Sequence, residues 1–471
     1  MTDAAPDTPS RQRRPGTLRI PILLAALVAL LGASLFPGAA RAQTDVEVVF
    51  SSPPSPVGSG ARAAGVGSAF IGLADDATAA SWNPSGLTQL DRPELSVVGR
   101  GIWQVDQIGS GTLEANVNGT DQVYTADGQR DDFESIGLNY LSAVFPVTVA
   151  GRNLVLSVNY QQMLSFERVL HFHQTNSLPD GTFFTSAFDH IRQTGGIDAA
   201  TLATAVEIVP DLSLGAAFNY WVDGLGNGYA WQQTYTIDGT LNIPDGTASG
   251  MIVPIGGVTI DTFRDFEGVN GTFGLLWKAA PNVSIGAVYK MPFTAHVDHL
   301  STSVGSSEIL AQRHRMQFPA SYGVGVSYRP EDRVTLSMDV TYVDWNHFRA
   351  VDSGGTEFLV TGDPAGESNV DGIFTPRIGA EYLWFVPGFK VAARGGAFYD
   401  PEPARNSPKS FYGVSAGLGL TFPRFSLDFA YQLRFGLDLK NTATTVNLLD
   451  VPDVATDTFQ NLFYGSIVAY F

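Results

Sequence analysis

Histidine is the residue type in this sequence whose spacing could bind a metal or move a proton. His171 with His173, and His296 with His299, have spacings that a metal could use, but neither pair is accompanied by a Cys or Glu set. Both pairs fall in segments predicted to be loops, where solvated histidine is the expected state. No zinc-protease motif is present, and no predicted strand offers a convincing Ser and His pair. We therefore expect no enzyme activity, no metal and no cofactor.

A small-residue stretch, Gly58 to Leu90, contains the acidic and turn-forming residues of greatest interest. Gly, Ala and Ser bury too little surface for this stretch to fold alone, but it could pack as a plug inside something larger. Pro84 biases Asn83 towards an extended backbone, and Asn83 can bond neighbouring backbone, so this point predicts a turn. If the stretch is a plug inside a barrel, its carboxylates need Arg or Lys partners from the wall. The alternative is a surface turn on a soluble domain, where water would solvate them. The candidate hatch residues are Asp75, Asp76, Asn83, Pro84 and Ser85.

Composition favours a β-protein with many turns and an apolar surface. The 471 residues include 50 Gly and no Cys, with 11% aromatic and only 16% charged residues. The formal net charge of −18 argues against nucleic acid as a partner.

The first residues predict a secretory signal peptide over 1–42. Arg11, Arg13, Arg14 and Arg19 form a basic region, Ile20 to Phe36 is apolar, and Ala40-Arg41-Ala42 is a cleavage site. No later stretch approaches the ~20 continuous apolar residues of a spanning helix.

Period-two alternation dominates the rest of the chain. On the segment that begins at Arg333, Leu336 and Met338 fall on one face, with Ser337 and Asp339 on the other. About fourteen such segments follow residue 92, each as long as a tilted membrane strand. Our expected spans are 93–105, 135–147, 152–164, 199–209, 211–223, 265–279, 282–294, 318–330, 332–345, 373–385, 388–399, 410–422, 424–437 and 459–471.

The connections between these segments alternate between short turns and long loops, as in outer-membrane barrels. Tryptophans fall near both ends of the segments, which predicts aromatic girdles: Trp103, Trp221 and Trp345 at one end, Trp277 and Trp384 at the other. The expected fold is all-β: a transmembrane antiparallel β-barrel of about 14 strands over 93–471. An N-terminal plug over 43–92 would fill it. The alternative, a large soluble β-sandwich, would leave too many apolar side chains in water.

Three motifs resemble the FadL-type long-chain fatty acid transporters, a family that includes aromatic hydrocarbon porins. The small-residue start from Gly60 to Phe70, the Ala-Asp-Asp-Ala segment at 74–77 and Asn83-Pro84-Ser85 resemble its N-terminal region, with Ser85 in place of Ala. Phe318 to Gly325, and Pro376 to Tyr382, are similar to later family segments. The resemblance spans most of the mature chain.

That resemblance implies a fourteen-stranded barrel closed by an N-terminal hatch. It implies that hydrophobic molecules bind at the extracellular face and pass into the lumen. Hatch movement and an opening near the third strand would then release them sideways into the membrane. The third predicted strand, 152–164, carries no internal Gly or Pro. The last residue, Phe471, resembles the signal read by the barrel-assembly machinery, and outer-membrane lipid is the expected surrounding.

Strand parity directs several charges into the lumen. If Ile378 and Ala380 face lipid, Arg377 and Glu381 face inward, and Arg394 is placed with them. An inward cation could hold a carboxylate head group, so Arg377, Glu381 and Arg394 are candidate ligand contacts. The alternative is an ion network that stabilises the barrel.

The predicted loop 165–198 is unusually apolar, which suggests a landing groove for a hydrophobic ligand. Its aromatic residues are Phe166, Phe172, Phe183, Phe184 and Phe188. The alternative is loop packing that only caps the barrel.

The sequence thus predicts an outer-membrane channel for passive uptake of hydrophobic small molecules, either long-chain fatty acids or hydrocarbons. One alternative is a barrel that does not transport and serves as a docking or structural partner for envelope proteins. Another is a general polar porin, which a seated plug should prevent.

Overall fold

The computed structural model describes residues 59–117, 120–149, 151–179, 183–226, 228–243, 251–304, 309–366, 369–439 and 454–471. All of these belong to one compact unit. The predicted signal peptide, 1–42, and the first part of the predicted plug, 43–58, lie outside the described residues. None of the described helices is long and apolar enough to cross a membrane.

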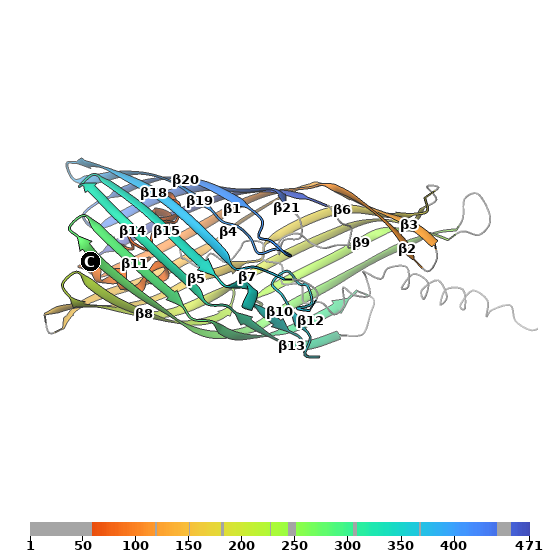
Figure 1. Cartoon of the computed structure of the whole chain (residues 1–471), viewed down its shortest axis with the longest axis horizontal. Helices are drawn as coiled ribbons and strands as arrows, with labels where there is room; N and C mark the ends of the chain where they lie inside the picture. Colours follow the sequence, from red (N-terminus) through yellow and green to blue (C-terminus); the bar gives the residue numbers. More distant parts are fainter. Residues whose placement is uncertain are drawn as a thin grey trace, which may run out of the picture. The chain divides into compact units, whose positions relative to one another are not determined.

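The fold is a closed antiparallel barrel of 14 strands, as predicted (Figure 1). It closes where the first wall strand pairs with the last, from Glu94 opposite Tyr470 to Ile108 opposite Thr456. The wall strands, in order around the barrel, are β1 (Glu94–Ile108), β4 (Arg130–Val149), β5 (Arg152–Ser165), β7 (Phe183–Val209), β8 (Leu212–Asp223), β10 (Met251–Ala280), β11 (Val283–Lys290), β14 (Ser321–Glu331), β15 (Val334–Val343), β18 (Ile373–Val386), β19 (Phe389–Tyr399), β20 (Phe411–Thr421), β21 (Phe425–Leu439) and β22 (Thr456–Tyr470). Each overlaps one predicted segment.

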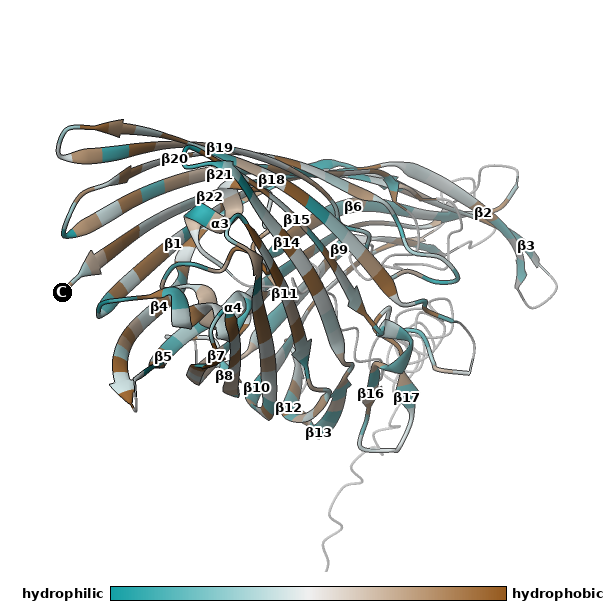
Figure 2. Cartoon of the chain, turned by 60° about the vertical axis from the view of Figure 1, so that its left-hand side comes forward, coloured by the Kyte–Doolittle hydropathy of each residue, from teal (hydrophilic) through white to brown (hydrophobic). Residues whose placement is uncertain are grey.

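Alternating side chains give the barrel an apolar outside and a polar inside. On β15, Leu336 and Met338 are 43% and 55% exposed, whereas Ser337 and Asp339 are buried in the lumen. Figure 2 shows the same alternation along many strands. Because closure pairs the first strand with the last, the wall has no free sheet edge facing hydrocarbon.

Short turns join the wall strands at one end, which we call the periplasmic end. The opposite, extracellular end is built differently from the prediction, because most of the expected long loops are strands. The added strands are β2 (Ser110–Val117), β3 (Thr120–Gly128), β6 (Arg168–Ser177), β9 (Trp231–Ile243), β12 (Phe293–Ser303), β13 (Ile309–Phe318), β16 (Arg349–Val351) and β17 (Glu357–Phe358). Long parts of β7 and β10 extend with them.

The prediction of loops at 106–134, 165–198, 224–264 and 295–317 was therefore wrong. These segments keep the strand period: the side chains of β6 alternate between buried and half-buried along its whole length. Pairing with neighbouring hairpins continues the wall beyond the length that a membrane strand needs (Figure 1).

Tryptophan placement was predicted correctly in part. Trp103, Trp277 and Trp384 are 42%, 48% and 45% exposed on the outer surface. Trp221 and Trp345 are buried instead. Trp221 shares the inward face of β8 with Asn219, and Trp345 lies in a short 3-10 helix (Trp345–His347) that follows β15.

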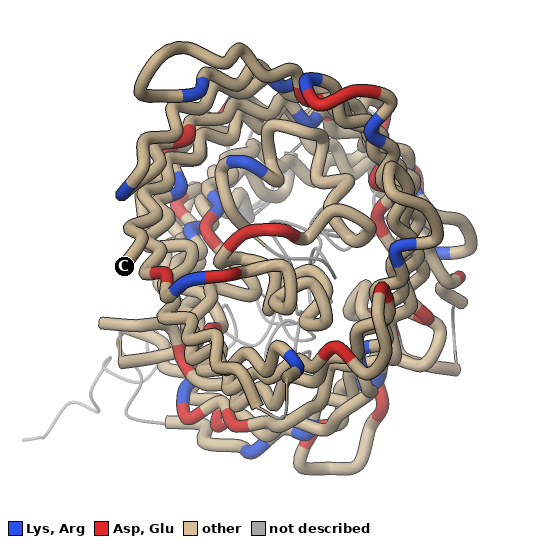
Figure 3. Tube along the Cα trace, turned by 90° about the vertical axis from the view of Figure 1, so that its left-hand side faces the viewer, with Lys and Arg blue, Asp and Glu red and all other residues tan. Residues whose placement is uncertain are grey.

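The described part of the predicted plug, residues 59–90, lies inside the ring of strands (Figure 3). It forms three short helices, α3 (Ala61–Gly65), α4 (Ala79–Trp82) and the 3-10 helix η1 (Pro84–Gln89). Its apolar side chains share one buried cluster with inward residues of the wall, including Val144, Val155 and Val288.

Candidate functional site

The plug lies backbone against backbone on the wall. At several wall glycines an added Cβ would collide with a backbone atom of the plug: at Gly286 with the Ile71 carbonyl, and at Gly379 with the Val66 carbonyl. A wall strand carries glycine where another backbone must approach closely. The other wall glycines in this contact ring are Gly215, Gly325, Gly396 and Gly417.

Asn83 is fully buried and uses its whole amide at the plug–wall boundary. Its Nδ2 donates to the Ile71 carbonyl within the plug (3.1 Å) and to the Leu275 carbonyl of β10 (3.0 Å). Its Oδ1 accepts from the Ser85 hydroxyl (2.6 Å). Pro84, also buried, is the first residue of η1, where its missing N–H costs nothing. The predicted turn is thus a cross-link between two parts of the plug and the wall.

Asp75 and Asp76 have the cationic and donor partners that burial requires. Asp75 contacts Arg62 Nη1 (2.6 Å) and the Arg329 guanidinium of β14 (2.7 Å). Asp76 accepts from the backbone N–H (2.8 Å) and hydroxyl (2.6 Å) of Thr78. Burial raises the pKa of Asp76, and the charge of Arg62 opposes that rise.

Arg62 joins the plug to the wall. Its Nε and Nη2 each donate to the Glu381 carboxylate at 3.1 Å, in a bidentate pair. Burial works against its charge, but Asp75 and Glu381 hold the pKa of Arg62 well above its ordinary value. Arg62 was not among the predicted site residues. Its sequence signal is that it is the single cation in the stretch from Gly58 to Leu90, which also carries the two carboxylates Asp75 and Asp76.

The predicted lumen charges all face inward, and each has a charged partner. Glu381 and Arg394 lie opposite each other on β18 and β19, with Arg394 Nε 2.6 Å from the carboxylate. Arg394 Nη1 also contacts Asp428 (2.6 Å), and Arg377 contacts Asp400 (3.5 Å). These contacts are those of an ion network, the alternative interpretation, and the network includes the plug through Arg62.

A wall carboxylate that the sequence analysis placed only in the lumen holds the plug backbone. Asp339 Oδ2 accepts from the Ile71 N–H (2.7 Å). Nearby, Ser415 Oγ donates to the Gly65 carbonyl (3.0 Å). Residues 413–417 match a G-x-S-x-G pattern, but they lie within β20 and form no strand-to-helix elbow. Ser415 is thus a contact for the plug.

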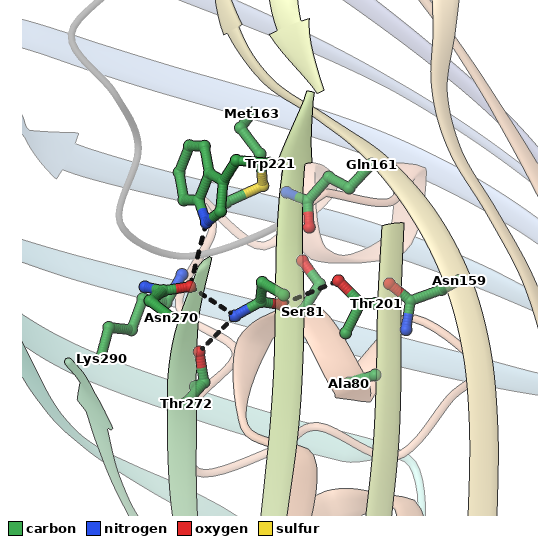
Figure 4. A pocket seen from close by; sticks show the side chains of 11 residues that line it. Ala80, Ser81, Asn159, Gln161, Met163, Thr201, Trp221, Asn270, Thr272 and Lys290 are labelled. Atoms are coloured by element: carbon green, nitrogen blue, oxygen red, sulfur yellow. Dashed lines mark hydrogen bonds between the residues drawn. The ribbon is translucent and has the colours of Figure 1, made fainter. Parts of the chain in front are cut away.

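A polar pocket lies directly against the plug helix α4 (Figure 4). The wall side chains form a connected amide and hydroxyl ladder: Asn219 Nδ2 donates to Asn270 Oδ1 (2.9 Å), and Trp221 Nε1 donates to the same oxygen (3.0 Å). Asn159 is only 4% exposed, and its Nδ2 has no hydrogen-bond partner among the described residues. The further lining residues include Gln161, Met163, Thr201, Thr272 and Lys290.

The wall has a seam between β4 and β5 beside this pocket. The ladder of these two strands stops at Tyr140 opposite Gln161, although both strands continue. β4 remains paired with β1 beyond this point, and β5 remains paired with β7. Closer to the extracellular end, the Asp131 carboxylate of β4 accepts a hydrogen bond from the His171 N–H (2.6 Å) and so joins β4 to β6.

Each of the two strands carries a bulge at the seam. The β1–β4 register skips Asn139, and the β5–β7 register skips Met163, so each strand carries one extra residue at the seam. Met163 lines the pocket. At the lower edge of the seam, the Tyr140 hydroxyl donates to the Ala77 carbonyl of the plug (3.1 Å). Pocket, plug and seam therefore meet at one place.

The aromatic residues of 165–198 do not face a common groove. Phe166 and Phe172 are buried, and Phe166 stacks on Trp231 at 4.6 Å between ring centroids. Phe188 is 58% exposed and stacks on His173, whereas Phe184 is half-buried. The side chain of Phe183 lies outside the described part of the structure. The strand period sends neighbouring residues to opposite faces, which a loop would not.

The large apolar residues on the outside mark this as a membrane barrel of the outer-membrane type. No family model matches the sequence, and no curated protein matches it. The fold of this chain is similar to that of several solved structures. A Pseudomonas aeruginosa FadL homologue has a TM-score of 0.60 at 13% identity, covering 89% of this chain and 99% of its own.

The toluene transporters TbuX of Ralstonia pickettii and TodX of Pseudomonas putida both have a TM-score of 0.51 at 15% identity. The matches cover 88% and 90% of this chain, and 99% and 100% of theirs. At this identity the likeness shows a shared barrel fold.

Proposed function

We propose that this chain is an outer-membrane channel of the FadL type that takes up hydrophobic small molecules passively. The observation that carries the proposal is the meeting of the plug, a lumenal pocket and a wall seam at Tyr140 and Met163. A ligand in that pocket has the plug on one side and a break in the wall beside it. Sideways release through the seam then needs only a small movement of the plug.

The pocket favours a ligand with an acidic head group, such as a long-chain fatty acid, over a plain hydrocarbon. Lys290 supplies an amino group, and Asn159 supplies a buried donor that has no partner among the described residues. The apolar tail would lie along Met163 and Trp221. Arg377 and Arg394 are weaker candidates for the head group, because each already contacts a carboxylate.

Binding by the purified protein tests this proposal. We expect a fluorescent C16 fatty acid to bind, hexadecane to compete weakly, and Lys290→Met to weaken fatty-acid binding at least tenfold. Asn282→Ala, at an exposed turn residue next to β11, is the control. A deletion strain should also lose uptake of the same acid. Normal uptake, together with a stoichiometric envelope partner in a pull-down, would favour the docking alternative.

Two further parts of the proposal concern the surroundings of the barrel. The exposed apolar belt faces outer-membrane lipid. Phe471 directly follows the last strand, and we propose that its exposed aromatic side chain is read by the barrel-assembly machinery. Phe471→Ala should slow assembly, measured as the unfolded fraction in heat-modifiability gels. The chain is proposed to have no enzymatic role.

A further inference from the structure

A short segment of the chain occupies the extracellular side of the lumen. We call residues Glu357 to Gly366 the lid segment. Its consecutive apolar residues Phe358, Leu359 and Val360 are all buried, and Val360 is 0% exposed. They belong to one apolar cluster with Trp221, the tryptophan that also lines the pocket. The lid segment therefore fills space that is continuous with the proposed ligand pocket.

Four aromatic residues of the same cluster, Trp221, Phe293, Phe318 and Phe348, form what we call the aromatic cup. Trp221 and Phe293 have ring centroids 4.7 Å apart, and Phe293 stacks on Phe318 at 4.8 Å. Phe348 meets Phe318 edge-on at 5.5 Å. Such a surface binds apolar chains and rings without regard to charge. In this structure Phe358, Leu359 and Val360 are buried in the same apolar cluster as these rings.

The lid segment is held by few regular contacts. Only Glu357 and Phe358 are in a strand, β17, which pairs with β16, itself paired with β13 at the mouth of the barrel (Figure 2). Beyond Phe358 the segment folds on itself, with the Leu359 N–H donating to the Asp363 carbonyl (2.8 Å). Its outer tether is an ion pair from Asp363 to Arg405, whose Nε lies 3.2 Å from the carboxylate.

The tether is a bidentate ion pair, because Arg405 Nη2 also donates to the Asp363 carboxylate. The Arg405 side chain is 36% exposed and that of Asp363 is 10% exposed, so water and salt screen the pair only in part. The apolar contacts of Phe358, Leu359 and Val360 are the part of the attachment that a hydrophobic ligand can replace.

We propose that the aromatic cup is an apolar ligand site and that the lid segment occupies it in the absence of ligand. A hydrophobic chain or ring displaces Phe358, Leu359 and Val360, and then passes Trp221 to the pocket. This inference rests on the proposed uptake function. It adds a capture site, and it makes lid displacement the first step.

A single thiol can report the displacement, because the chain has no Cys. In purified Val360→Cys protein, we expect slow labelling by a maleimide. Labelling should become at least tenfold faster when Arg405→Ala removes the tether, and also when a fluorescent C16 fatty acid or naphthalene is bound. Leu359→Cys, in the same cluster, provides a second reporter.

Two controls separate lid movement from general loosening. Thr356→Cys, at an exposed position before the lid segment, should label rapidly in every state. Arg313→Ala breaks another exposed ion pair, with Asp298, and should leave Val360→Cys labelling slow.

The results distinguish the inference from the function on which it rests. Binding of a probe without faster labelling at either thiol overturns the lid proposal and leaves uptake standing. Binding of no probe, by the wild type or by the Arg405→Ala variant, overturns the uptake function and the lid proposal together.

Discussion

Arg62 is the residue whose charge connects the plug to the barrel wall. Replacement by Ala would leave Asp75 with Arg329 and Glu381 with Arg394, but no cation would join the two carboxylates. Because each carboxylate keeps another arginine, the loss is that of the charged hydrogen bonds of Arg62, about 2 kcal/mol. We expect Arg62→Ala to loosen the plug by about this amount, measured as faster amide hydrogen exchange over residues 61–72.

Amide hydrogen exchange in the barrel strands should not change, because these strands pair independently of Arg62. Arg152→Ala, at an exposed periplasmic turn, is the matched control and should leave plug exchange unchanged. Equal protection of the plug in the Arg62 variant and the wild type would show that backbone contacts alone hold it.

Asn83 makes the polar cross-link at the other end of the plug. Ala at this position leaves the Ser85 hydroxyl without its acceptor and breaks the bond to the Leu275 carbonyl. Lost buried hydrogen bonds cost about 1–3 kcal/mol. We expect Asn83→Ala with Pro84→Ala to change uptake while the barrel still inserts, shown by a normal heat-modifiability shift. Failure to insert would make the plug a folding element.

At the scale of elements, the plug depends on wall strands that carry glycine at the contact. A methyl group at Gly286 would meet the Ile71 carbonyl, and overpacking of this kind costs about 1–3 kcal/mol. We expect Gly286→Ala to displace the plug, measured as protease sensitivity of residues 59–90 in the assembled protein. Gly137→Ala on β4, where a Cβ meets nothing within 4 Å, should have no effect.

At the scale of the whole molecule, the plug decides whether the barrel is a pore. Wall strands that pair into a closed ring do not need the plug for closure. We expect deletion of residues 59–90 to leave an inserted barrel with a steady ion conductance in planar bilayers, at least tenfold above wild type. Conductance as low as that of the wild type would mean that the lid segment and the extracellular strands block the lumen by themselves.

The sequence by itself determined the barrel and the location of its wall strands. Alternation with period two is a local property, so Leu336 and Asp339 reveal their faces without any knowledge of their neighbours. Strand alternation also places Trp221 on the inward face together with Asn219. The prediction instead assigned Trp221 to an aromatic girdle because it lies near a strand end. Asn83 was a candidate from sequence because Pro84 and the small neighbouring residues constrain the backbone locally, and its role in the hatch stays a prediction.

Only the tertiary structure decided which residues meet. Arg62 and Glu381 are 319 positions apart, and their contact depends on where the plug enters the ring. The seam coincides with bulges at Asn139 and Met163, which are register shifts between strands and leave no residue-type signal. The lid segment resembles a loop in sequence, since its burial comes from aromatic residues that other strands supply. Local patterns fix the direction of a side chain, whereas closure of the barrel fixes its partners.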